Sequence, residues 1–125
     1  MILALLPLLA AAAPTPAIGV DDPDLRCMVA VSFAMGAVHD KGADPDMVEA
    51  MSTVFMYFLG KADARHPGED YGRAFARVVA QPGYEQQLPA DLKRCGGEAE
   101  ARGAMLKDLG EQLKSLAPLA PVSPG

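Results

Sequence analysis

The sequence has few of the residues from which sheets and reactive sites are commonly built. It contains no tryptophan, two cysteines and two histidines, and its β-branched residues do not gather into runs. Because strands are enriched in β-branched and aromatic side chains, this scarcity argues against a β-sheet protein. Half of the residues are hydrophobic, with alanine and leucine abundant, and this composition favours helices.

The sequence also lacks the motifs of common catalytic and metal sites. It contains no glycine-rich phosphate loop, no C-x-x-C pair and no H-E-x-x-H motif. Redox catalysis by cysteine normally relies on C-x-x-C spacing, which lowers the pKa of one thiol. An enzyme of this size has to display its chemistry in few residues, so we expect no catalytic residue, no cofactor and no bound metal ion.

Positive charge is scarce as well. The chain carries 16 acidic and 11 basic residues, a net charge of −5, and its lysines and arginines are scattered singly except at Lys93-Arg94. Nucleic acids and anionic lipids do not attract a net anion that has no basic patch. We therefore expect no nucleic-acid binding, and we expect any partner to be another protein.

A run of apolar residues opens the chain. Met1 to Ala13 reads MILALLPLLAAAA, which is too short to span a bilayer as a helix and ends in small residues. Signal peptidases require small side chains three residues and one residue before the cut, and both Ala10-x-Ala12 and Thr15-x-Ala17 meet this requirement. The positively charged start that usually precedes such a run is missing. We interpret residues 1–17 as a signal peptide cleaved near residues 12–17, and expect a periplasmic or secreted protein with no stable membrane insertion after cleavage.

Export makes the two cysteines informative. Small exported domains usually pair their cysteines, whereas cytosolic proteins usually keep them reduced. Cys27 and Cys95 each lie in an apolar pattern of helical spacing. We therefore expect one structural disulfide that joins them.

Capping residues, prolines and glycines divide the rest of the chain into four helices. An Asp-Pro-Asp start occurs twice, at Asp22 and at Asp44, and apolar residues at helical spacing follow each one. Tyr84–Leu88 is interpreted as a loop with at most one helical turn, because Pro89 suits the first turn of a helix. The predicted helices run from Asp22 to near Gly42, from Asp44 through Leu59, from Glu69 to Ala80 and from Pro89 to Leu116. Gly60 lies either near the end of the second helix or at a close crossing within it, and His66–Gly68 is a turn.

This division predicts one domain with a short tail. Residues 22–117 are expected to form a small all-α bundle of about four helices, stapled by the Cys27–Cys95 bond. Residues 118–125 are rich in proline and are expected to be a disordered tail. The last helix has the clearest apolar seam, with steps of three and four residues that thin at Arg102 and Gly103. The seam consists of Leu92, Cys95, Ala99, Leu106, Leu109, Leu113 and Leu116.

His39-Asp40 is the nearest approach to a catalytic pair. Ser32 lies on roughly the same helical face as His39 but seven residues earlier, too far along the axis for a hydrogen bond. The acidic residues Asp40, Asp44 and Asp46 do not follow the twelve-residue calcium-loop pattern. A histidine suits the carboxyl end of a helix and an aspartate suits the amino end, so we interpret these residues as structural.

Seven methionines are many for so short a chain. Thioethers bind Cu(I), but these methionines occur singly at core-like positions. Such residues are typical of an adaptable core, or of an apolar face that accepts varied partners. The candidate binding face is the apolar stripe of the second predicted helix, formed by Met47, Met51, Phe55 and Phe58.

The layout of a signal peptide, a cysteine in the first helix and another in a late helix resembles the HdeA-like group of periplasmic proteins. That group includes acid-stress chaperones, which are shorter than this chain, and certain immunity proteins of type VI secretion. Only Cys27 and Cys95 correspond to paired positions there. Two segments, Met56–Pro67 (MYFLGKADARHP) and Lys93–Gly103 (KRCGGEAEARG), resemble short exported proteins of α-proteobacteria. The resemblances imply a noncatalytic periplasmic protein that binds partners or acts as a chaperone. The alternative is an immunity-type protein that occludes one specific partner, and an enzyme ranks third.

Overall fold

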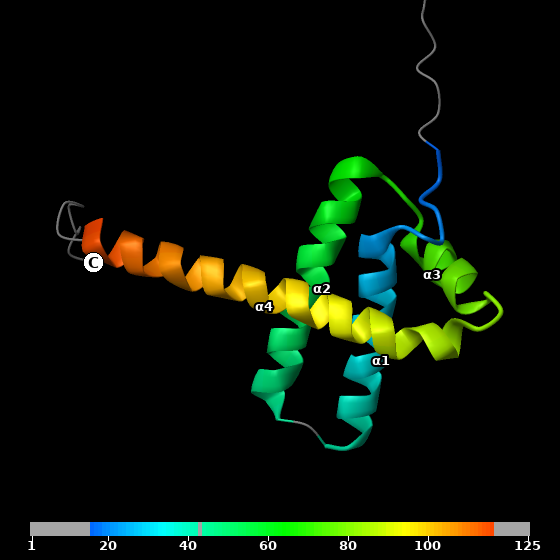
Figure 1. Cartoon of the computed structure of the whole chain (residues 1–125), viewed down its shortest axis with the longest axis horizontal. Coiled ribbons are helices and arrows are strands. Elements are labelled where there is room, and N and C mark those ends of the chain that lie inside the picture. The colour runs from blue at the N-terminus through cyan, green and yellow to red at the C-terminus, as the bar shows by residue number, and fades with distance from the viewer. Residues whose placement is uncertain (1–15, 43, 117–125) are drawn as a thin grey trace, which may run out of the picture.

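The computed structural model describes residues 16–42 and 44–116, and these residues form helices and loops without a strand (Figure 1). Four helices make up the fold, namely α1 (Pro23–Asp40), α2 (Pro45–Arg65), α3 (Tyr71–Val79) and α4 (Tyr84–Leu116). The prediction of a small all-α bundle is confirmed. The predicted tail at 118–125 and all but the last two residues of the predicted signal peptide lie outside the described residues.

Aspartate caps begin the first two helices. The Asp22 carboxylate accepts hydrogen bonds from the backbone N–H groups two and three residues later, at 3.0 and 3.1 Å. The Asp44 carboxylate accepts one from the N–H group two residues later, at 2.9 Å. Between these helices Gly42 has a φ of +72°, in the left-handed region that favours glycine. Local signals therefore set both sides of the α1–α2 connection.

Two helices, α3 and α4, have boundaries that differ from the prediction. α3 is shorter than residues 69–80, and α4 begins at Tyr84 rather than at Pro89. α2 continues past Gly60 to Arg65, so the second of the two positions considered for Gly60, within the helix, is the one observed. A proline near a helix start removes one backbone hydrogen bond, so the helix tolerates it there better than in its interior. The Tyr84 side chain is buried, with its ring 5.8 Å from that of Phe33. Burial of this ring fixes the extra turn of α4 in spite of the proline.

α1 is the central helix and packs against each of the other three. It forms an antiparallel pair with α2, and α4 crosses this pair, while α3 lies near the start of α1 (Figure 1). The core lies where the four helices approach one another, and it includes one residue that precedes the predicted domain, Ile18, which is 1% exposed. Apart from the two cysteines, the largest fully buried side chains of the core are those of Ile18, Leu25, Met28, Val29, Phe58 and Val78.

The predicted disulfide is present and joins α1 to α4. Cys27 and Cys95 have Cα atoms 5.5 Å apart, and both residues are buried in the core. The sequence suggests that the bond ties two helix starts together. That holds for Cys27, but Cys95 lies about three turns into α4, because α4 starts at Tyr84. The bond therefore fixes the point at which α4 crosses α1.

A buried ion pair lies on the same side of α4. Arg26 on α1 donates to Asp91 on α4 at 2.8 Å, and both side chains are about one-tenth exposed. The guanidinium also donates to Gln87 at 2.7 Å and to Gln81 at 3.3 Å. A buried charge is tolerated only when it is paired and hydrogen-bonded. This network therefore stabilises the buried guanidinium of Arg26.

The second half of α4 departs from the predicted packed seam. α4 has 33 residues and α2 has 21, so α4 is about 50 Å long and crosses a pair of helices that is much narrower. Its last turns project beyond the bundle (Figure 1), and the side chains described there, including Met105 and Leu113, are exposed. Within the described ranges, no helix is both long enough and apolar enough to cross a membrane.

Replacing both Cys27 and Cys95 with serine is expected to lower the free energy of unfolding by about 4 kcal/mol, because the unfolded chain regains the entropy of a 68-residue loop. Urea unfolding of the variant and the oxidised wild type, followed by circular dichroism, measures the loss. Reduction of the wild type serves as control, because it breaks the bond without introducing serine hydroxyls. Equal unfolding midpoints for oxidised and reduced protein would contradict the expectation.

Asp91→Asn is expected to lower the free energy of unfolding by about 3 kcal/mol, because Arg26 would remain buried without a charged partner. Asp108→Asn is the matched control, since Asp108 lies on the exposed part of α4 and the substitution is the same. Chemical denaturation of both variants at neutral pH measures the difference. A loss at Asp91 no larger than that at Asp108 would show that the pair is dispensable.

Candidate functional site

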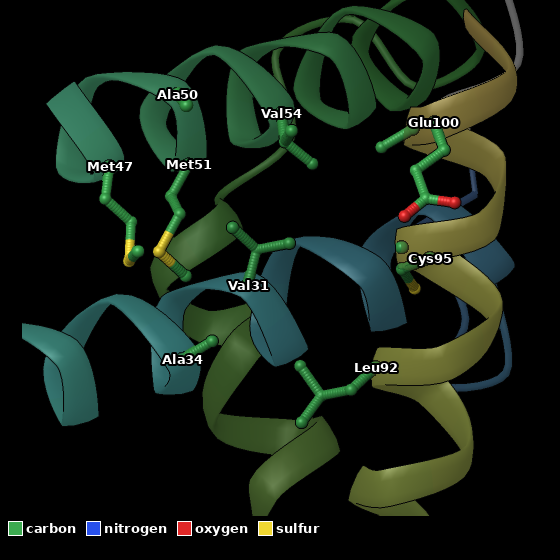
Figure 2. A pocket seen from close by; sticks show the side chains of 11 residues that line it. Val31, Ala34, Met47, Ala50, Met51, Val54, Leu92, Cys95 and Glu100 are labelled. Atoms are coloured by element: carbon green, nitrogen blue, oxygen red, sulfur yellow. The ribbon is translucent and has the colours of Figure 1, made fainter. Parts of the chain in front are cut away.

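An apolar hollow of about 330 Å³ opens between α1, α2 and α4. We call it the groove. Figure 2 shows Met47 and Met51 reaching toward it from α2, Val31 from α1 and Leu92 from α4. Its lining consists of Val31, Ala34, Met47, Ala50, Met51, Val54, Leu92, Cys95, Gly96, Ala99 and Glu100.

The groove exists because small residues face one another where the helices diverge. Ala34, Ala50 and Ala99 come from three different helices, and Gly96 lies beside the disulfide on α4. A Cβ atom added to Gly96 would meet nothing within 4 Å. Side chains this short leave the space between the helices unfilled, and the flexible methionines border it without closing it.

The surroundings of the groove are acidic. Glu100 is the one ionisable residue among its lining residues. The first turns of α2, beside Met47, carry Asp46 and Glu49, and Asp44 caps that helix. Lys41, in the connection before it, is the nearest basic residue in the sequence. We call Glu100 and these three acidic residues at the start of α2 the rim; together with Lys41 they carry a net negative charge.

A second, smaller hollow continues along α4. Its volume is about 150 Å³, and it shares Val54 and Ala99 with the groove. Beyond these two residues it is lined by Thr53, Tyr57, Arg102 and Gly103. The two hollows therefore form one apolar track that runs beside α4 toward its projecting end.

The structure divides the predicted binding face of α2. Met47, which is 52% exposed, and Met51 line the groove. Phe58 is fully buried in the core, and Phe55 packs edge-on against Phe75 with ring centroids 6.2 Å apart. The apolar stripe is continuous along α2, but only its carboxyl-terminal half is covered by the other helices. Phe58 is therefore not accessible to a partner, and Phe55 is only partly so.

Most of the remaining lining could not be found from the sequence. Val31 and Leu92 belong to the apolar patterns of their own helices, and nothing in those patterns shows that they face each other across a hollow. Only Gly96 and Ala99, the small residues near Cys95, could have indicated from the sequence that a hollow lies beside α4. Residues this small on one side of α4 leave space beside the helix.

The residues considered for catalysis do not form a site. His39 and Asp40 are both more than four-fifths exposed, with 3.9 Å between Nδ1 and Oδ1. The Ser32 hydroxyl donates to the backbone carbonyl of Met28 at 2.8 Å, within its own helix. Over residues 16–42 and 44–116, no three His, Cys, Asp or Glu side chains are grouped so that they could hold a metal ion.

Ionisable side chains gather instead where α2 meets α1 and α4. The Lys61 ammonium lies 2.8 Å from Asp24 and 2.5 Å from Glu98. Tyr57 donates to Glu98 at 3.0 Å and accepts from Arg102, also at 3.0 Å. Because Tyr57 and Arg102 line the second hollow, this network holds the walls of the apolar track in place.

The same network shifts the protonation of its members. The hydrogen bond from Lys61 is the main reason that the pKa of Glu98 lies below its ordinary value, against an opposing effect of partial burial. Burial alone would lower the pKa of Lys61, but its bonds to Asp24 and Glu98 outweigh that effect and raise the pKa. Burial would likewise raise the pKa of Asp22, but bonds from Arg65 and two backbone N–H groups lower it.

No protein-family model matches the chain, and comparisons with curated proteins and with solved structures find no match either. The case for a function therefore rests on the groove and its surroundings.

Glu98→Gln is expected to make stability less dependent on acid. Since Glu98 has a lower pKa in the folded than in the unfolded chain, where it is near 4.5, its contribution is complete above that pH and is lost as the pH falls through the folded value. At pH 7 the variant should lose about 1 kcal/mol of unfolding free energy. The difference from the wild type should shrink as the pH falls through the folded value, because Glu98 becomes protonated in both states.

Urea unfolding at several pH values measures this difference. Glu100→Gln is the matched control, since Glu100 lies two residues away on α4 and is exposed. It should follow the wild type throughout. A loss for Glu98→Gln that is the same at acid and neutral pH would contradict the ionic role of Glu98.

Proposed function

We propose that the protein is a noncatalytic, exported binding protein whose groove takes up a helical segment of another polypeptide. The observation that carries the proposal is the open apolar groove, in which Met47 stays half exposed beside Met51. An apolar surface of this kind on a small protein is typical of an interaction site. Glu100 is the one ionisable side chain in its lining, and no nucleophile or second ionisable group accompanies it there.

The shape of the groove favours a helix as the occupant. It continues into the second hollow along α4, and a helix lying beside α4 would contact Leu92, Ala99 and Gly103 in turn. These positions are spaced at seven and four residues on α4, the repeat at which two helices present side chains to each other. Helix-in-groove recognition reads such apolar anchors at three- and four-residue steps.

The rim indicates the charge of the partner. Glu100 lines the groove, Asp44, Asp46 and Glu49 lie close to Met47 in the sequence, and the whole chain carries a net charge of −5. Charge complementarity increases the association rate and disfavours partners of the same sign. The proposed partner segment is therefore an amphipathic helix with an apolar stripe and basic residues beside it.

Two features support a chaperone-like role over recognition of one fixed partner. Methionine side chains adapt to differently shaped neighbours, and proteins that bind many partners use them for this purpose. The groove floor also lacks a charged or amide side chain that would select one sequence. The acidic rim suits an immunity-type protein that occludes one basic partner, which is the second candidate.

The disulfide supports export. Structural disulfides persist in oxidising compartments and are rare in the cytosol of mesophiles. The Cys27–Cys95 bond is buried and joins the two helices that carry much of the groove. A periplasmic or secreted location, reached through the predicted signal peptide at residues 1–17, belongs to the proposal.

Met47→Glu is expected to weaken binding of a fluorescent, synthetic leucine–lysine amphipathic helix by about tenfold or more, because the new carboxylate would lie on the apolar floor. Met56→Glu is the matched control. Met56 is also an exposed methionine of α2, and the same charge is added, but it does not line the groove. Fluorescence anisotropy measures both affinities, and Met56→Glu should bind like the wild type.

Two further comparisons sharpen this test. A leucine–glutamate peptide with the same apolar stripe should bind more weakly than the leucine–lysine peptide, because the rim repels it. Suppression of aggregation of two unrelated unfolded proteins should follow the same order of variants if the role is chaperone-like, and should be absent from an immunity-type protein. Equal binding by the Met47 and Met56 variants would refute the groove as the binding site.

A further inference from the structure

The backbone of Ile18 is held on both sides at the point where the chain enters the core. Its N–H group donates to Oε2 of Glu69 at 3.0 Å, and its carbonyl accepts from Arg77 at 3.2 Å. The Ile18 side chain is 1% exposed, whereas Pro16 and Ala17 are exposed. The change from exposed to buried chain therefore falls between Ala17 and Ile18.

The N–H group of Ile18 donates to the Glu69 carboxylate, and few other groups balance the negative charge of that carboxylate. The Glu69 side chain is 11% exposed, and Arg77 is the one cation with which it forms an ion pair among the described residues. Arg77 is 3.6 Å away from the other carboxylate oxygen, Oε1, and is itself nearly half exposed. The closest donor to Glu69 is thus a neutral amide. A buried carboxylate is better satisfied by a cation with several N–H donors.

We propose that the chain is cleaved between Ala17 and Ile18, and that the new α-ammonium group of Ile18 forms a buried ion pair with Glu69. Water adds across the Ala17–Ile18 peptide bond, which leaves a carboxylate on Ala17 and an ammonium group on Ile18. The nitrogen already lies at hydrogen-bond distance from Oε2, so cleavage turns a single amide donor into a charged group at the same position. The inference rests on the proposed export, because a signal peptidase performs the cut.

The residues before the cut fit this enzyme class. Thr15 and Ala17 are the small residues three positions and one position before the bond, as a signal peptidase requires. The alternative cut after Ala12 would leave residues 13–17 attached, and the Ile18 nitrogen would remain an uncharged amide. Only the cut after Ala17 supplies Glu69 with a new charge.

The burial of Ile18 also sets the order of events. In the folded protein the Ile18 side chain lies in the core and both of its backbone polar groups are bonded, so a protease could bind the residues on both sides of the bond only after this segment left the core. Cleavage therefore precedes the packing of this segment against α3. The ion pair forms as the exported chain folds.

The first test determines the mature amino terminus. The full chain is expressed in a bacterial host, the periplasmic and cytosolic fractions are separated, and the protein is measured by intact mass and amino-terminal sequencing. A periplasmic product that starts at Ile18 supports the inference. A periplasmic product that starts at Ala13 overturns it and leaves the proposed export standing, whereas an uncut cytosolic product overturns both.

The second test asks whether the new terminus is paired. Chains 18–125 and 13–125, the products of the two possible cuts, are each compared with their Glu69→Gln variants by urea unfolding. Loss of the ion pair should raise the unfolding equilibrium constant about tenfold more in the chain that starts at Ile18 than in the longer chain. Glu85→Gln, at an exposed position, should have the same small effect in both. An equal effect of Glu69→Gln in both chains would overturn the pairing.

Discussion

The covalent bond between Cys27 and Cys95 determines where the longest helix lies on the rest of the molecule. α1 packs against each of the other described helices, and the bond attaches α4 to it at a buried point. Cys95 itself lines the groove, with Gly96 and Ala99 next to it. A sideways shift of α4 would close the hollow or open it wholly to solvent, and the bond prevents that shift.

Two groups of charged side chains act with the bond along the same face of α4. Asp91 comes one turn before Cys95 and pairs with Arg26, and Glu98 comes one turn after it and pairs with Lys61. Steps of four and three residues keep these three attachments on one side of the helix. The neighbouring side of α4 carries small side chains and is left open. The helical repeat thus places the residues that attach α4 to α1 and α2 on one face, and the small residues that leave the groove open on the next.

Local features of the structure followed from the sequence, whereas features that depend on distant contacts did not. The caps at Asp22 and Asp44 act within a few residues, and the disulfide followed from the compartment that the first residues suggest. The burial of Ile18 and the pairing of Arg26 with Asp91 depend on residues more than 50 positions apart. The stripe on α2 was visible as a pattern, but which half of it stays uncovered is decided by the paths of α3 and α4. For that reason Met47 lies on the surface and Phe58 in the core, although both belong to the same apolar stripe in the sequence.

Because part of α4 projects beyond the bundle, the two halves of this helix should unfold locally at different rates. The whole of α4 contains four glycines, at positions 96, 97, 103 and 110, and each weakens the helix by about 1 kcal/mol relative to alanine. Between Asp91 and Glu98 the disulfide and ion pairs offset that loss, but beyond Gly103 the helix extends past its neighbours, and a helix of about fourteen residues is marginal in water by itself. Backbone amides should therefore exchange with solvent in two regimes along one continuous helix. They should exchange slowly around Cys95, at the rate of global unfolding, and orders of magnitude faster toward Leu113, by local fraying.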